Sequence, residues 1–223
     1  MINLQRRLVA EWLGTALLLA TVVGSGIMAE RLAGGNVGLA LLANSIATGG
    51  VLIALILTFG GVSGAHFNPA VSLAAALRGE LNKGETLFYI AAQIFGAFAG
   101  VAAAHMMFGE PLFFASQHVR SGPAQWWSEF VASFGLLAVI LGCSRHRAES
   151  VPVAVAGYIV AAYWFTASTS FANPAVTLAR AASDTFAGIR PQDVAGFIAA
   201  QLAGSIAATT VFGWLLAEQD THH

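Results

Sequence analysis

The amino-acid sequence predicts an all-α membrane protein with six transmembrane helices and two shorter helices that enter the bilayer without crossing it. Of its 223 residues, 57% are hydrophobic and only 9% are charged, whereas a soluble domain carries roughly a quarter charged residues. The mean hydropathy is +0.72. Six apolar stretches are long enough to cross a bilayer, and two shorter apolar stretches remain.

A spanning helix needs about 20 mostly apolar residues. Such stretches occur at residues 8–29, 36–59, 84–108, 123–143, 151–170 and 191–217. The first contains Glu11 and no small-residue cleavage site, so we expect a span there and not a signal peptide. An even number of crossings places both termini on one side. Six of the ten Lys and Arg residues favour the cytoplasm for that side, which predicts a multi-pass protein of the cell inner (plasma) membrane.

Two apolar stretches, residues 63–77 and 170–179, are too short to cross the bilayer alone. Each contains the tripeptide Asn-Pro-Ala, at Asn68, Pro69 and Ala70 and again at Asn173, Pro174 and Ala175. Asparagine is a preferred helix N-cap, and proline is favoured at the first helical position. We therefore predict two half-helices that begin at Asn68 and Asn173.

The two tripeptides belong to an internal repeat. Asn173 follows Asn68 by 105 residues, and the pattern Ala-Ala-Gln at 91–93 recurs at 199–201. We expect one domain, residues 1–223, built from repeats of about 1–115 and 116–223, each with three spans and one half-helix. Because three is odd, the second repeat should be inverted in the membrane, so that the half-helix N-termini meet near the midplane.

Facing half-helix tips indicate a polar passage through the bilayer, since non-helical backbone at membrane depth must be buried in protein or bathed in water. Each N-terminus carries about +0.5 of an elementary charge, so the pair repels cations while neutral hydroxylated molecules pass. If the side-chain oxygens of Asn68 and Asn173 cap their own helices, the amide N–H groups can donate to a solute. His66 is expected to line this passage, with a packed structural histidine as the alternative.

Glu11 and Glu129 lie inside predicted spans, one in each repeat. A charged side chain at the bilayer centre costs at least about 2.5 kcal/mol. We interpret both as structural buried carboxylates that accept hydrogen bonds from the backbone of the re-entrant loop of their own repeat. The alternative is that one carries a coupling proton, as in a secondary transporter, but their symmetric placement favours the structural interpretation.

Several other functions are disfavoured by the composition. A net charge of −1 with scattered basic residues offers no patch for nucleic acid. The single cysteine, Cys143, permits neither an internal disulfide nor a cysteine-based metal cluster. We expect no metal, no cofactor and no enzymatic activity, because no nucleophile and base are paired within the spans. His222 and His223 could be a truncated tag.

Together these features resemble the aquaporin and aquaglyceroporin family, the major intrinsic proteins. The resemblance covers the whole chain, including the run 63–71 and the paired glutamates. It implies a right-handed aquaporin-like bundle and a homotetramer in which each subunit has its own pore. It also implies a selectivity filter outside the midplane, which the spacing from the two tripeptides places at Thr48, Ala161, Ser170 and Val176.

This filter departs from the family pattern. Most members have arginine where this chain has Val176, and water-selective members tend to have histidine and phenylalanine at the positions of Ala161 and Thr48. Small neutral residues widen the filter, and loss of a guanidinium removes a fork of hydrogen-bond donors. Arg180 lies one helical turn further along and is not expected to replace it, so cation exclusion should depend on the two helix dipoles.

We therefore expect a passive channel for small uncharged solutes, namely glycerol-like polyols, trivalent metalloid hydroxides such as arsenite, and water. The arsenite assignment rests on a resemblance to bacterial members linked with arsenic resistance. A water-selective channel and an ion-coupled secondary transporter are the alternatives. The expected partners are small neutral solutes and the lipid bilayer.

Overall fold

The computed structural model describes residues 2–217, so His222 and His223 lie outside the described residues. Within this part of the chain the regular elements are helices, and six of them are long and apolar enough to cross a bilayer when two are counted together with the 3-10 turns that lead into them. They are α1 (Leu4–Leu32), α2 (Val37–Ser63), α4 (Lys83–Phe108), α5 (Pro123–His146), α6 (Val151–Phe165) and α8 (Val194–Leu215). Short 3-10 turns, Ala148–Ser150 and Pro191–Asp193, lead into α6 and α8. The predicted all-α membrane fold is confirmed.

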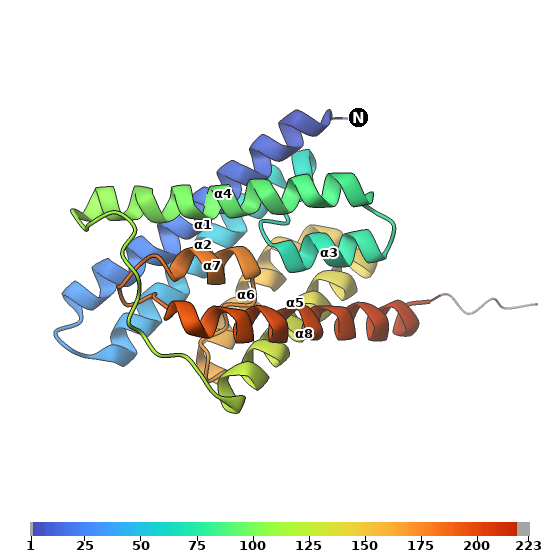
Figure 1. The fold of residues 1–223 in the computed structure, drawn as a ribbon. Coiled ribbons are helices and arrows are strands. Elements are labelled where there is room, and N and C mark those ends of the chain that lie inside the picture. The colour runs from blue at the N-terminus through green and yellow to red at the C-terminus, as the bar shows by residue number, and fades with distance from the viewer. Residues whose placement is uncertain (1, 218–223) are drawn as a thin grey trace, which may run out of the picture.

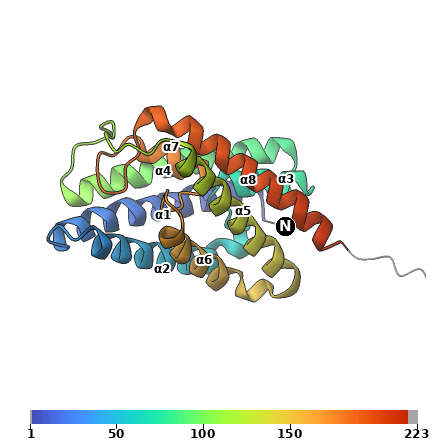
Figure 2. The same ribbon diagram turned by 90° about the horizontal axis from the view of Figure 1, so that it is seen from below.

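The spans surround two short helices, α3 (Pro69–Leu77) and α7 (Pro174–Arg180). α1 packs against α2 and α4, α5 packs against α6 and α8, and α2 contacts α6. The short helices lie between α4 and α8 (Figure 1). The start of α1 and the end of α8 lie at the same end of the bundle in both views (Figures 1 and 2).

Both half-helices begin where the sequence predicts. The Oδ1 atom of Asn68 accepts a hydrogen bond from the Ala70 N–H at 2.9 Å. Asn173 Oδ1 accepts from the N–H groups of Ala175 and Val176 at 3.0 and 3.2 Å. Proline occupies the first turn of each helix. Side-chain capping satisfies backbone donors that would otherwise be unpaired inside the bilayer.

The fifth predicted span, residues 151–170, is too long, because α6 ends at Phe165. The Thr166 N–H still bonds to the Ala162 carbonyl, but the backbone then leaves the helix. Thr169 and Ser170 have φ angles of 60° and 50°, in the left-handed region, which is incompatible with continuing a right-handed helix. The last residues of the predicted span therefore belong to the loop before α7.

Two glycines allow the long helices to approach each other closely. A Cβ atom at Gly96 in α4 would overlap the backbone carbonyl of Trp12 in α1. A Cβ atom at Gly204 in α8 would overlap the carbonyl of Phe130 in α5. Small residues at such contacts are the usual means of close helix packing in membranes. The α1–α4 and α5–α8 pairs are thus built in the same way.

We expect Gly204→Ala to lower the stability of the folded protein, because its methyl group forces α8 away from α5. Overpacking of this kind costs about 1–3 kcal/mol. Thermal unfolding of the detergent-purified protein measures the effect as a lower melting temperature. Gly213→Ala, in the same helix, is the matched control, since nothing lies within 4 Å of a Cβ there. Equal melting temperatures for the two variants would show that close approach at Gly204 is not needed.

Candidate functional site

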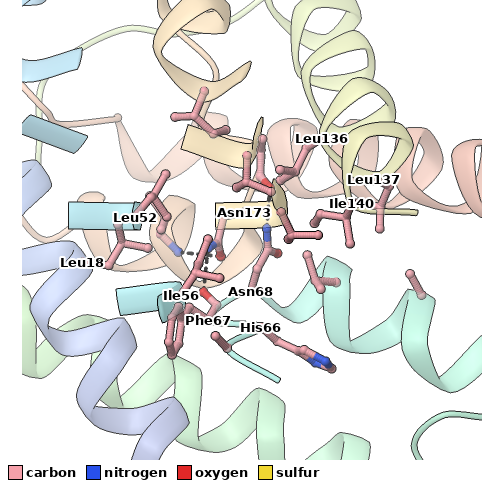
Figure 3. A pocket seen from close by; sticks show the side chains of 18 of the residues that line it. Leu18, Leu52, Ile56, His66, Phe67, Asn68, Leu136, Leu137, Ile140 and Asn173 are labelled. Carbon is pink, nitrogen blue, oxygen red and sulfur yellow. Dashed lines mark hydrogen bonds between the residues drawn. The ribbon is translucent and has the colours of Figure 1, made fainter. Parts of the chain in front are cut away.

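The tips of α3 and α7 meet, and each asparagine bonds to the loop before the other half-helix. Asn68 Nδ2 donates to the Ala172 carbonyl at 2.8 Å. Asn173 Nδ2 donates to the Phe67 carbonyl, also at 2.8 Å. Each amide group has two N–H bonds, so one on each asparagine is left for a further acceptor. The two side chains lie side by side in the middle of a cavity (Figure 3).

This cavity has a volume of about 230 Å³ and follows both half-helices. It is lined by Arg78 beyond the C-terminal end of α3 and by Arg180 at the C-terminal end of α7. Its walls are mostly aliphatic, with contributions from α1, α2 and α5 that include Leu18, Leu52, Ile56, Leu136, Leu137 and Ile140 (Figure 3). The polar groups are therefore concentrated at the asparagines, the adjoining loops and the ends.

Glu11 holds the loop before α3. Its side chain is fully buried and accepts hydrogen bonds from the backbone N–H groups of His66 and Phe67, at 3.0 and 2.7 Å. The Ser63 hydroxyl and the Gln93 amide also donate to it, at 2.6 and 2.8 Å. Four donors around one carboxylate offset the cost of burying it.

Glu129 holds the loop before α7 in the same way. It is fully buried and accepts from the N–H groups of Phe171 and Ala172 at 2.9 and 2.8 Å. Gln201 Nε2 donates to it at 2.6 Å and to the Thr177 hydroxyl at 2.8 Å. Both glutamates thus contact the loop of their own half, as the structural interpretation requires.

The two loops share an unusual backbone conformation. Ala65 and Phe67 have φ angles of 51° and 48°, and Ser170 and Ala172 have 50° and 48°. Left-handed backbone costs roughly 1–2 kcal/mol per non-glycine residue. Within residues 2–217, nothing donates to the carbonyl oxygens of Ala65 and Ser170. Because both residues line the cavity, these carbonyls remain available to a molecule inside it.

Three of the four predicted filter residues line the cavity: Thr48, Ser170 and Val176. Their exposed fractions are 4%, 3% and 5%. Thr48 projects from α2, Ser170 from the loop and Val176 from the first turn of α7. The structure therefore brings these three side chains to one cavity.

The prediction is wrong at Ala161, which is exposed on another face of α6 and does not line the cavity. α6 instead contributes Val155, Ile159 and Tyr163, which recur every fourth residue. Ala161 follows Ile159 by two residues, a rotation of about 200° around the helix axis. The Tyr163 hydroxyl lies 3.1 Å from the Thr48 Oγ1 atom, so the pair joins α6 to α2 across this part of the cavity wall.

His66 also lies in the cavity wall. Its Nδ1 atom is 3.1 Å from the Ser72 hydroxyl, and its ring centroid is 5.4 Å from that of Tyr89. Both interpretations considered from the sequence therefore apply to His66: its side chain lines the cavity, and it is packed against neighbouring side chains. Among residues 2–217, no group of three or more His, Cys, Asp or Glu side chains could hold a metal ion.

Arg180 lines the same cavity as Val176 and was not included in the predicted site. It is 3% exposed, and its guanidinium carbon lies 3.4 Å from the ring centroid of Phe171. Arg120, in the loop between α4 and α5, lies 5.0 Å from the same centroid. Burial lowers the pKa of Arg120, although Glu129 and Tyr163 oppose this shift. The helical period would have identified Arg180, because residues four apart share one face.

We expect Glu129→Gln to destabilise the protein, because one carboxylate oxygen becomes an NH₂ group that faces a backbone N–H donor. Each lost hydrogen bond to a charged group is worth about 1.5–3 kcal/mol. The melting temperature in detergent and the yield of folded protein measure the effect. Glu149→Gln, at an exposed position before α6, is the control and should behave as wild type. A Glu129→Gln variant as stable as this control would contradict the structural role.

Comparisons with known proteins agree with this geometry. A sequence model of the major intrinsic protein family matches residues 1–163. The chain is 56% identical to aquaglyceroporin AqpS of Rhizobium meliloti (strain 1021) over 214 residues, 96% of this chain and 91% of that protein. It is 40% identical to human (Homo sapiens) Aquaporin-9 over 101 residues, 45% of this chain and 33% of that protein.

A solved structure shows the same fold. The X-ray structure of the aquaglyceroporin from Plasmodium falciparum matches with a TM-score of 0.70 at 21% identity, covering 96% of this chain and 95% of that one. The family match, the full-length relative and the fold lead to one conclusion. The chain belongs to the major intrinsic protein family and is a non-enzymatic, multi-pass membrane channel for small neutral solutes.

Proposed function

We propose that the channel has a wide, neutral selectivity filter that passes glycerol-like polyols and trivalent metalloid hydroxides, including arsenite, together with water. The observation that carries this proposal is Val176, a small apolar residue in the cavity wall directly after the second Asn-Pro-Ala tripeptide. A guanidinium at this position would fill space and donate hydrogen bonds, whereas valine does neither. The relative named an aquaglyceroporin supports the solute class.

The cavity is chemically suited to a molecule with a hydrocarbon side and a hydroxyl side. Aliphatic residues of α1, α2 and α5 form one part of the wall. The carbonyls of Ala65 and Ser170, to which nothing in residues 2–217 donates, supply acceptors, and the amide groups of Asn68 and Asn173 supply donors. Hydroxyl groups can both donate and accept, so a polyol or a metalloid hydroxide can exchange partners along this row.

Passive conduction accounts for the buried glutamates better than ion coupling does. A coupling site needs a carboxylate that exchanges a proton or ion during transport. In this structure Glu11 and Glu129 each accept two backbone N–H bonds and a glutamine N–H bond. Release of either carboxylate would leave these donors unpaired inside the protein.

A water-selective channel is the second candidate, and one observation favours it. The Tyr163 ring, and not the methyl group of Ala161, lines the cavity near Thr48. An aromatic side chain takes up more of the passage than alanine. Its hydroxyl contact with Thr48 holds the ring against the α2 wall, however, and Val176 contributes only a small side chain to the same cavity.

The proposal also includes how the chain is placed and assembled. The halves, about residues 1–115 and 116–223, act as inverted repeats, each ending its own re-entrant loop with Asn-Pro-Ala. The start of α1 and the end of α8 lie at one end of the bundle (Figures 1 and 2), which supports both termini on one side of the membrane. The distribution of Lys and Arg favours the cytoplasmic side of the inner (plasma) membrane. A homotetramer is expected from the family.

We expect Val176→Arg to reduce glycerol and arsenite flux by about tenfold or more. The guanidinium narrows the filter, and its hydrogen-bond donors bind acceptor groups in the cavity wall. Water flux should fall less, since a water molecule is smaller. Stopped-flow shrinkage and reswelling of proteoliposomes with each solute measures all three. Val176→Thr, which keeps the size of the side chain, is the matched control.

Glycerol and arsenite flux unchanged in Val176→Arg would place the filter elsewhere. Wild-type vesicles that pass water and exclude glycerol would support the water-selective alternative. Flux that saturates and follows an imposed proton gradient would instead indicate a coupled transporter.

A further inference from the structure

One charged side chain on the cavity wall, Arg180, forms no ion pair with any residue of 2–217. Of the residues that the structure describes, three with charged side chains line the cavity: Arg78, Glu80 and Arg180. Arg78 Nε and Glu80 Oε1 form an ion pair at 2.8 Å, so their charges compensate each other. No acidic group within residues 2–217 forms an ion pair with Arg180. The charges of Glu129 and Arg120 act on it at longer range and in opposite directions, so a positive charge remains in the cavity wall at the C-terminal end of α7.

The Arg180 guanidinium is fixed by neutral groups. Its Nε donates to the backbone carbonyl of Ala187, and its plane lies over Phe171, which also lines the cavity. Its two terminal nitrogens make no hydrogen bond to any part of the chain that the structure describes. Neither the carbonyl nor the ring cancels a full positive charge, so the field of this group extends into the cavity.

Low-dielectric walls strengthen that field. Unit charges interact several times more strongly near protein than in bulk water. A cleft lined by charges of one sign also concentrates their electric field. A cation or hydrated proton that passes Arg180 meets this repulsion in addition to that of the two helix N-termini. A neutral polyol is not repelled, and it can accept hydrogen bonds from the terminal nitrogens of Arg180.

We propose that Arg180 is the residue that determines charge selectivity in this channel, while the size of permeant solutes is set at Thr48, Tyr163 and Val176. The inference rests on the proposed function. Arg180 follows Val176 by one helical turn, about 6 Å along α7. Charge exclusion and size selection are therefore carried by different residues, so the filter widens at Val176 without loss of the cation barrier.

Proteoliposomes containing the full-length protein test this assignment through two fluxes from one preparation. Glycerol permeability is measured by stopped-flow light scattering, and proton and potassium leak by a trapped pH dye and a potential-sensitive dye. We expect Arg180→Gln and Arg180→Met to raise the ratio of cation leak to glycerol permeability by about tenfold or more. Arg180→Lys, which keeps the charge, should retain the wild-type ratio.

Arg31→Gln is the matched control, since it removes one positive charge at the end of α1, where Arg31 pairs with Glu110 outside the cavity. Its ratio should equal that of wild type. A purely structural role for Arg180 would change melting temperature but not the ratio, and it would not be rescued by lysine. Wild-type ratios in both neutral variants would overturn the inference. Absence of glycerol flux in wild type would overturn the proposed function instead.

Discussion

The shape of the cavity depends on the hydrogen bonds that two buried carboxylates accept from the loops before α3 and α7. Glu11 and Glu129 bind backbone N–H groups on one side of each loop. Within residues 2–217 this leaves the carbonyls of Ala65 and Ser170 without a donor, and it stabilises left-handed backbone at non-glycine residues. Hydrogen bonds to charged groups are worth about 1.5–3 kcal/mol each, comparable with the cost of that conformation. The asparagine tips meet because the loops are held in this way.

The two halves share a scaffold but differ in charge. Val71 and Val176 occupy equivalent positions after the two Asn-Pro-Ala tripeptides, and both line the cavity. The equivalent of Arg180, 105 residues earlier, is Ala75. The cavity is thus nearly symmetric in its wall and its capping, but electrically asymmetric. Function is adjusted at a few side chains while the repeated framework stays the same.

Much of this architecture could be predicted because it is encoded locally. Span lengths follow from bilayer thickness, and the starts of the half-helices follow from the capping preferences of Asn68 and Asn173. The face of α6 could not be derived from spacing, since the loop after Phe165 contains left-handed residues whose path depends on Glu129. Ala161 was misplaced for that reason, and Tyr163 was missed. The role of Gln93 and Gln201 needed coordinates, although their recurrence in the repeat marked them.

The exchange of hydrogen bonds between the tips also constrains how the protein is made. The Asn68 Nδ2 atom donates to the Ala172 carbonyl, and the Phe67 carbonyl accepts from Asn173, so both partners lie more than a hundred residues later in synthesis. The first half of the nascent chain must therefore wait in the bilayer with its re-entrant loop incomplete. Closure of the midplane is a late event in biogenesis, and a ribosome that stalls before α7 leaves behind a product without a pore.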